Sequence, residues 1–133
     1  MTPKMIPKFR AKDENGVWHT GLLTFMFGQY AIVNESDENT VYLIDKETVG
    51  QSTALTGKDG VEIFEGDIVS HSDGEFSYEG VVTQDTVTCW WIKGIDPDDN
   101  FQFEDIADYR DYTCDLEVIG NIYENRDLLE VSK

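Results

Sequence analysis

Two histidines and two cysteines are the residues of this chain whose side chains most often take part in nucleophilic or metal chemistry. Neither His19 nor His71 belongs to an H-x-x-x-H or H-E-x-x-H pattern, so the spacing gives no support to a histidine metal site. Cys89 and Cys114 each stand alone, without the C-x-x-C spacing of metal or redox sites. We expect both cysteines to be buried and reduced, as small hydrophobic residues.

One acidic loop has part of the spacing of a calcium site. Asp96, Asp98 and Asn100 occupy the first, third and fifth positions of such a loop. Phe101 stands at the sixth position, where glycine is needed, and Ala107 stands at the twelfth, where a bidentate glutamate is needed. The chain also has no P-loop, no G-x-G-x-x-G and no G-x-S-x-G motif. We therefore expect no metal, no cofactor, no catalytic residue and no enzymatic activity.

Charge is the most unusual global feature of the chain. It has 133 residues, of which 27 are acidic and 10 are basic, so its net charge is −17. Residues 1–64 hold nine acidic and six basic residues, whereas residues 65–133 hold eighteen and four. Direct binding to nucleic acid is disfavoured, because the only basic cluster is Lys4, Lys8, Arg10 and Lys12. The acidic surface is either a solvated face or a surface that matches a basic partner.

The composition predicts one packed, β-rich domain. Hydrophobic residues make up 40% of the chain and aromatic residues 12%. Gly, Asn and Asp residues, which favour turns, separate short segments in which apolar and polar residues alternate. The main expected strands are Val17–Leu23, Gln29–Val33, Val41–Ile44, Val87–Lys93 and Leu116–Tyr123. No apolar run approaches the roughly 20 residues of a membrane span, and no signal peptide pattern opens the chain. We therefore expect no membrane association and a cytoplasmic location.

The stretch Val49–Val69 organises the rest of the chain. Asp59-Gly60 allows a tight turn with positive φ, and alternating apolar residues flank it. Glu65-Gly66-Asp67 then bends the chain into the apolar start Ile68-Val69. The pattern predicts a β-hairpin that leads into the first strand of a small barrel or sheet.

Several residues outside any catalytic pattern are candidates for a structural or binding role. Those that would form turns or allow close strand approach are Gly50, Gly60, Gly66, Asp67 and Gly120. Asn125 is predicted to be the N-cap of a two-turn carboxy-terminal helix. Gln51 and Asn121 either cap turns or line a shared polar site.

Trp90 and Trp91 are neighbours in an expected strand, so they must point to opposite faces. Either this strand is covered on both faces, or one of the two is an exposed interaction residue.

Five segments of the chain form a recognisable set: Lys8–Ala11, Val49-Gly50-Gln51, Gly57–Gly60, Ile63–Val69 and Glu117–Asn125. Together they resemble the signature of the YopX-type proteins of bacteriophages and prophages. The segments occur in the family's order and span most of the chain. Ser52 stands where an aromatic residue is usual, and Ala54 where glycine is usual. The resemblance implies a phage setting and a β-rich fold, and it implies no reaction.

The sequence therefore predicts a mainly β (α+β) fold, an SH3-like small barrel with additional amino-terminal strands and a short carboxy-terminal helix. Residues 1–48 would form an amino-terminal β layer, and residues 49–133 the barrel and helix, within one compact unit. The expected function is that of a phage accessory protein in the bacterial host cytoplasm, a non-enzymatic module that binds a host or phage protein. An acidic nucleic-acid mimic that inhibits a host DNA-binding protein and a nucleic-acid-binding β-barrel remain alternatives. The aromatic segment Val87–Lys93 suggests a homo-oligomer.

Overall fold

The computed structural model describes residues 8–34, 36, 37, 39–72, 74, 77–86, 89–96, 100–103, 106–108 and 110–129. The chain divides into two compact units, Met1–Ser52 and Thr53–Lys133. The sequence placed a division after Thr48, which is the last residue of the 3-10 turn η1 (Lys46–Thr48).

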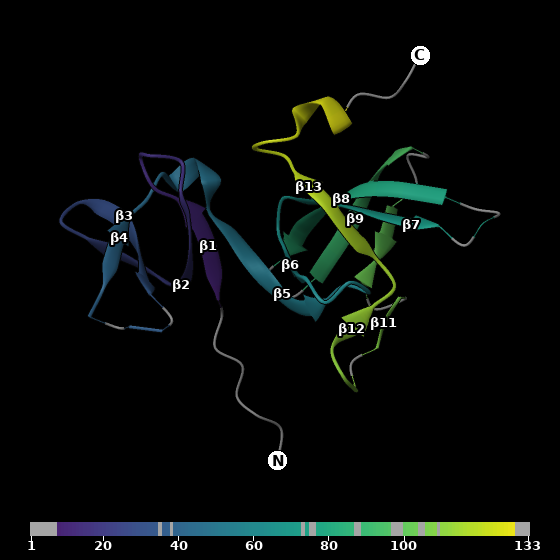
Figure 1. Ribbon diagram of the computed structural model, residues 1–133, viewed down its shortest axis with the longest axis horizontal. Helices are drawn as coiled ribbons and strands as arrows, with labels where there is room; N and C mark the ends of the chain where they lie inside the picture. Colours follow the sequence, from purple (N-terminus) through teal and green to yellow (C-terminus); the bar gives the residue numbers. More distant parts are fainter. Residues whose placement is uncertain are drawn as a thin grey trace. The chain divides into compact units, whose positions relative to one another are not determined.

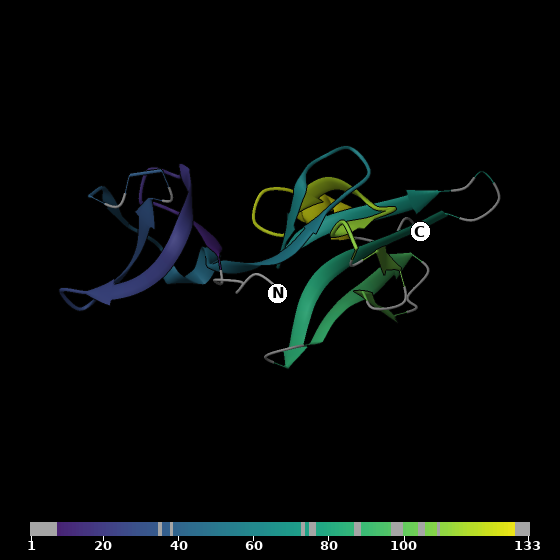
Figure 2. The same cartoon turned by 90° about the horizontal axis from the view of Figure 1, so that it is seen from below.

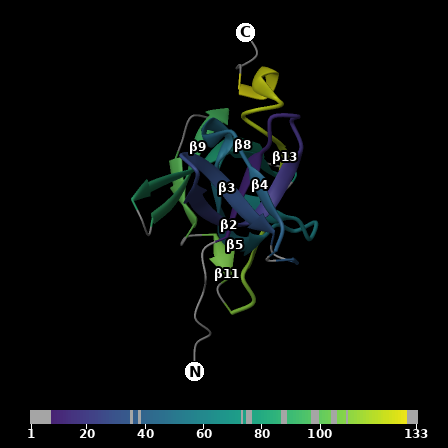
Figure 3. The ribbon, with the colours of Figure 1, turned by 90° about the vertical axis from the view of Figure 1, so that its left-hand side faces the viewer.

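The first unit is an antiparallel sheet. Strand β1 (Phe9–Lys12) pairs with β2 (Trp18–Met26) on one side and with the first residues of β5 (Gly50–Thr56) on the other. Strands β3 (Gln29–Asn34) and β4 (Val41–Leu43) continue this sheet, so β4 lies at its edge (Figures 1 and 3). Among the described residues of this unit, the fully buried apolar side chains are Ala11, Ala31 and Ile32.

Local sequence explains the two tight turns of this sheet. Between β1 and β2, the Asp13 Oδ1 accepts the backbone N–H groups of Asn15 (2.8 Å) and Val17 (3.0 Å). Between β2 and β3, Phe27 and Gly28 both have positive φ, 52° and 77°. This is the backbone that a two-residue hairpin turn requires, and the Phe27 side chain is 92% exposed there.

The second unit is built on a five-stranded sheet in the order β10-β9-β8-β7-β13. Its strands are β7 (Asp67–Ser72), β8 (Ser77–Thr86), β9 (Cys89–Asp96), β10 (Asn100–Gln102) and β13 (Glu117–Asn121). Figure 2 shows β8 and β9 as a long curved hairpin. The last residues of β5 pair with β6 (Glu62–Phe64) and with β12 (Thr113–Cys114), which in turn pairs with β11 (Ala107–Asp108).

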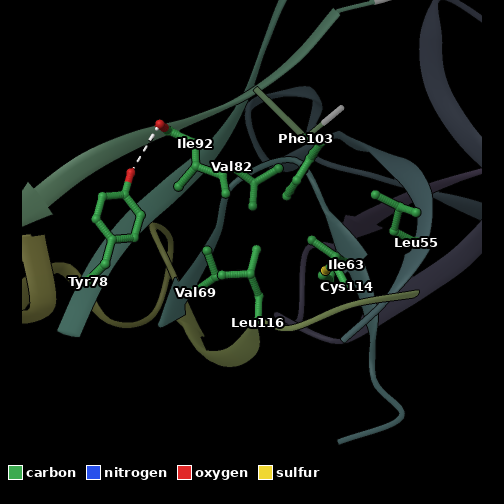
Figure 4. Packing of buried hydrophobic residues seen from close by; sticks show 9 residues of the cluster. All are labelled: Leu55, Ile63, Val69, Tyr78, Val82, Ile92, Phe103, Cys114 and Leu116. Atoms are coloured by element: carbon green, nitrogen blue, oxygen red, sulfur yellow. Dashed lines mark hydrogen bonds between the residues drawn. The ribbon is translucent and has the colours of Figure 1, made fainter. Parts of the chain in front are cut away.

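These strands enclose the main hydrophobic core of the described residues. The cluster consists of Leu55, Ile63, Val69, Tyr78, Val82, Ile92, Phe103, Cys114 and Leu116 (Figure 4). Tyr78 is only 3% exposed, and its hydroxyl donates a hydrogen bond to the Ile92 carbonyl (3.2 Å). The hydroxyl at the tip of this buried ring is therefore satisfied, as burial requires.

The hairpin predicted around Asp59-Gly60 is confirmed. Gly60 has φ of 83°, and Gly57 donates its N–H to the Val61 carbonyl (2.8 Å) at the base of the turn between β5 and β6. A Cβ atom on Gly57 would lie 2.5 Å from the Leu116 carbonyl oxygen. The two glycines are therefore needed for different reasons, Gly60 for its φ and Gly57 for close approach.

The mainly β prediction is confirmed, but two finer features are not. The described strands form two sheets, and neither closes into an SH3-like barrel, because β10 and β13 end the five-stranded sheet without pairing with each other. In place of the two-turn helix, Arg126–Leu129 form a single 3-10 turn, η3. So short a segment gains too few hydrogen bonds to sustain an α-helix. Residues 130–133 lie outside the described part of the chain.

Candidate functional site

The second unit contains an apolar pocket of about 320 Å³. Its lining residues come from β7, β8, β9, β10 and the segments on either side of β11 and β12: His71, Tyr78, Ile92, Phe101, Ile106, Asp115 and Leu116. The register explains part of this convergence, because His71 is paired with Tyr78 across β7–β8, and Ile92 with Phe101 across β9–β10. The volume falls at the lower end of the range of ligand pockets.

Aromatic and aliphatic side chains form the interior of the pocket. The rings of Tyr78 and Phe101 meet edge to face, with centroids 4.9 Å apart and planes at 83°. Because the Tyr78 hydroxyl is bonded to Ile92, it presents its ring rather than a free polar group to the pocket. Ile106, at 36% exposure, contributes apolar surface that is open to solvent. The pocket thus suits an apolar group.

Two polar residues complete the lining. The His71 Nδ1 lies 3.0 Å from the Asp115 backbone oxygen and 3.4 Å from its Oδ2. The Asp115 side chain is 73% exposed and the His71 side chain 29%. A carboxylate therefore stands beside an apolar pocket, in an arrangement that favours an apolar group with a nearby cation.

A thiol nucleophile has no support near this pocket. Cys114 is 6% exposed, and burial raises the pKa of its thiol above the ordinary value of 9.0. A raised pKa keeps the sulfur protonated at neutral pH, whereas the thiolate is the reactive form. Cys114 therefore acts as a core residue, in agreement with the sequence; the Cys89 side chain lies outside the described residues.

The signature residues Gly66 and Asp67 shape the turn from β6 to β7. Gly66 has φ of 90°, its N–H donates to the Val82 carbonyl, and its carbonyl accepts the Ile122 N–H, both at 2.9 Å. Asp67 is 1% exposed, and its Oδ2 accepts the Phe64 N–H at 2.8 Å. These contacts connect the turn to β8 and to the segment after β13, which gives both residues a structural role.

Gly120, Asn121 and Asn125 form a second local network at the end of β13. The Asn121 Oδ1 accepts the backbone N–H groups of Tyr123 and Glu124, both at 3.0 Å. The Asn125 Oδ1 accepts the Asn121 N–H at 3.1 Å. Asn125 immediately precedes η3, and this bond directs its side-chain oxygen back to β13. Its role as the N-cap of a helix stays a prediction.

Gln51 and Asn121 belong to different units of the chain. Gln51 lies in β5, where it is the partner of Phe9 in β1, and the neighbouring signature residue Gly50 is the partner of Arg10. Asn121 has the local turn contacts described above. The shared polar site stays a prediction.

The two tryptophans lie on opposite faces of the sheet, as their adjacency requires. Trp90 is partly buried and packs against the hydrophobic core. Trp91 is also partly buried, and with Thr83, Gln84, Lys93 and Asn100 it lines a polar groove of about 260 Å³. The Trp91 indole N–H is buried and has no hydrogen-bond partner among the described residues. Of the two, Trp91 is the better candidate for a contact with a partner.

The described residues contain neither a metal-binding cluster nor a membrane helix. No group of three or more of their His, Cys, Asp or Glu side chains is arranged to hold a metal ion. The calcium-like spacing starts at Asp96 and includes residues 97–99, which lie outside the described part of the chain. No helix within the described ranges has the length and apolar character needed to cross a membrane.

Sequence reasoning did not find the apolar pocket. Its lining residues are up to 45 positions apart, from His71 to Leu116, and only the fold brings them together. Nothing in the local pattern singled out Ile106 or Asp115, because each stands in an irregular, acidic segment.

Residues 8–130 match the protein family described as YopX protein. Among solved structures, the fold is similar to the crystal structure of protein EF1440 from Enterococcus faecalis, with a TM-score of 0.53 and 25% sequence identity. That similarity covers 96% of this chain and 100% of the other. No curated protein matches the sequence.

Proposed function

This chain belongs to the YopX family, and we propose that it is a non-enzymatic module that binds another protein through the apolar pocket of its second unit. The pocket itself carries the proposal. It is large enough for a single apolar side chain, its interior is formed by Tyr78, Phe101 and Leu116, and the Cys114 thiol near it is not activated. The family resemblance favours an accessory role in a bacteriophage or prophage, within the host cytoplasm.

Charge defines the kind of protein that would fit. Residues 53–133 hold twenty acidic and five basic residues, a net charge of −15. Asp115 places one of these carboxylates at the pocket. We therefore expect the partner segment to present a Leu, Ile, Phe or Met side chain next to Lys or Arg. Electrostatic attraction would speed the encounter, and burial of the apolar side chain would supply most of the affinity.

A library of random peptides displayed on phage tests the proposal. The immobilised chain should enrich peptides that have an apolar residue flanked by basic residues. Ile106→Arg, which fills the pocket mouth, should reduce binding of a selected peptide at least about tenfold. Val61→Arg is the matched control, because Val61 is 45% exposed and lies outside the pocket lining. Equal binding by the two variants would contradict the pocket as the site.

The nucleic-acid mimic makes a different prediction for the same partner. A mimic occupies the surface with which its target binds DNA, so duplex DNA should displace a captured DNA-binding protein. A partner that DNA cannot displace supports the plainer protein-binding role. Binding of nucleic acid by this chain itself has weaker support. The basic residues Arg10 and Lys12 stack over the Trp18 ring, at 4.8 and 5.2 Å, within a strongly acidic chain.

A further inference from the structure

The first unit has a sheet region without charge. The eighteen residues of β2, β3 and β4 include no Asp, Glu, Lys or Arg, although 28% of the whole chain is charged. On one face of these strands Leu22 is 48% exposed, Val41 37% and Leu43 49%. Register places them together, because Leu22 and Val41 both pair with Val33, and Leu43 follows two residues after Val41.

The same face ends at a strand edge, because β4 is the last strand of this sheet among the residues that the structure describes. Ile44 donates its N–H to a carbonyl of β3 (3.1 Å), and Thr40 accepts a backbone N–H from β3 (2.9 Å). Backbone groups alternate in an antiparallel ladder, so those of Val41 and Leu43 point away from β3. Soluble proteins usually protect such an edge with charged residues or proline, and β4 has neither.

We propose that β4 pairs with β4 of a second copy of this chain, antiparallel and about a two-fold axis at Tyr42. In this register Val41 of one copy faces Leu43 of the other, and their outward N–H and C=O groups form the new ladder. The exposed side chains of Leu22, Val41 and Leu43 then continue across the axis as one apolar surface.

Charge selects a second copy at this face. Two chains of net charge −17 repel each other, which favours contact through a strand that carries no acidic side chain of its own, as β4 does. The first unit holds seven acidic and five basic residues, against twenty and five in the second. An uncharged apolar face with a free strand edge is complementary to itself, which a two-fold interface requires. The proposal therefore assigns self-association to β4, whereas the sequence suggested Val87–Lys93.

Nearby acids make the association dependent on salt. Asp13, Glu14 and Asp45 line a groove beside Val41 and Leu43. Their repulsion across the two-fold axis should be screened as the Debye length falls from about 30 Å at 0.01 M salt to about 8 Å at 0.15 M. The dimer should therefore tighten with salt over this range.

Light scattering on the full chain at about 100 μM tests the proposal, since dimer population depends on protomer concentration. The wild type should have twice the 15.2 kDa mass of one chain. Leu43→Lys and Leu22→Lys, both at half-exposed positions, should be folded monomers. Val61→Lys introduces the same charge at an exposed site of the second unit and should remain a dimer.

A cysteine cross-link identifies the register. Tyr42→Cys should form an inter-chain disulfide under mild oxidation. In this register the two copies of residue 42 are a non-hydrogen-bonded pair of the antiparallel ladder, and the Cα atoms of such a pair lie about 4.5 Å apart. The wild type, which keeps its own two cysteines, is the control. A monomeric wild type would overturn the proposal, as would a dimer that Leu43→Lys leaves intact. A dimer in which Tyr42→Cys does not cross-link would overturn the two-fold axis at Tyr42.

Discussion

Gly120 and Asn125 lie so close together that a Cβ atom on Gly120 would come within 2.6 Å of the Asn125 Oδ1. That oxygen accepts the Asn121 N–H, so it cannot move away without losing the bond. The family signature residues at the end of β13 thus depend on each other. Because Gly120 has no Cβ atom, the Asn125 side chain can occupy that space, and its hydrogen bond to Asn121 stabilises the end of the strand.

This dependence predicts non-additive substitutions. Gly120→Ala should lower the free energy of unfolding by about 1–3 kcal/mol through overpacking, and Asn125→Ala by about 1 kcal/mol through the lost hydrogen bond. The double substitution should cost less than the sum, because the alanine that replaces Asn125 has no Oδ1 to meet the new methyl group. Urea unfolding of the four proteins measures the coupling. Strict additivity would contradict the contact.

At Gly60, in contrast to Gly120, the backbone conformation and not the available space limits substitution. Apart from its chain neighbours, no atom lies within 4 Å of the position that a Cβ atom would occupy, and only its φ of 83° is demanding. Gly60→Ala should lower the free energy of unfolding by about 1–2 kcal/mol, the cost of a left-handed conformation. Gly60→Asn should cost less than Gly60→Ala, because asparagine tolerates this region. Thermal unfolding compares the two. A larger loss for asparagine would show that space, and not φ, is limiting.

The sequence predicted the turns well because their causes are local. The Asp59-Gly60 turn and the Gly66-Asp67 turn depend on residues a few positions apart, and the structure has both. The strand alternation also indicated a mainly β fold. Closure of a barrel depends on which edge strands meet, and β10 and β13 show no local sign of their distant pairing.

The pocket could not be predicted for the same physical reason. His71 and Asp115 are adjacent in space and 44 positions apart in the chain, and no repeated pattern connects them. The two histidines were noticed as potential ligands, but only the fold shows that His71 faces a carboxylate beside an apolar pocket. The absence of charge in β2, β3 and β4 is visible in the sequence. That β4 lies at the edge of its sheet follows only from the order of the strands in the fold.

Ala54 differs from the residue expected at its position in the family signature, and its backbone has a positive φ. It stands where the family usually has glycine, and its φ is 67°, a conformation that glycine adopts without strain. Ala54→Gly should relieve about 1–2 kcal/mol of backbone strain and lose about 0.4–1 kcal/mol through the freer unfolded chain. The free energy of unfolding should therefore hold or rise slightly, as measured by urea unfolding.

The matched control for Ala54 is the same substitution at Ala107 in β11, which is outside the set of described residues with positive φ. Ala107→Gly has no strain to relieve, so it should cost about 0.5–1 kcal/mol. If both variants lose the same stability, Ala54 is not strained in solution.

The Asp13–His19 pair predicts how pH acts on the first unit. The His19 Nε2 lies 2.8 Å from the Asp13 Oδ2, and its ring stacks on Tyr42 with centroids 3.6 Å apart. The hydrogen bond to His19, followed by that from the Val17 N–H, lowers the pKa of Asp13 below its ordinary value of 3.8. Because the pKa is lower in the folded state, the stabilisation is present above pH 3.8 and is lost as pH falls through the folded-state pKa. His19→Ala, which removes the donor, should raise the pKa of Asp13, as followed by NMR titration of its carboxyl carbon. His71→Ala, in the other unit, is the control and should leave the pKa of Asp13 unchanged. If the pKa of Asp13 is the same in His19→Ala as in the wild type, the pair does not form in solution.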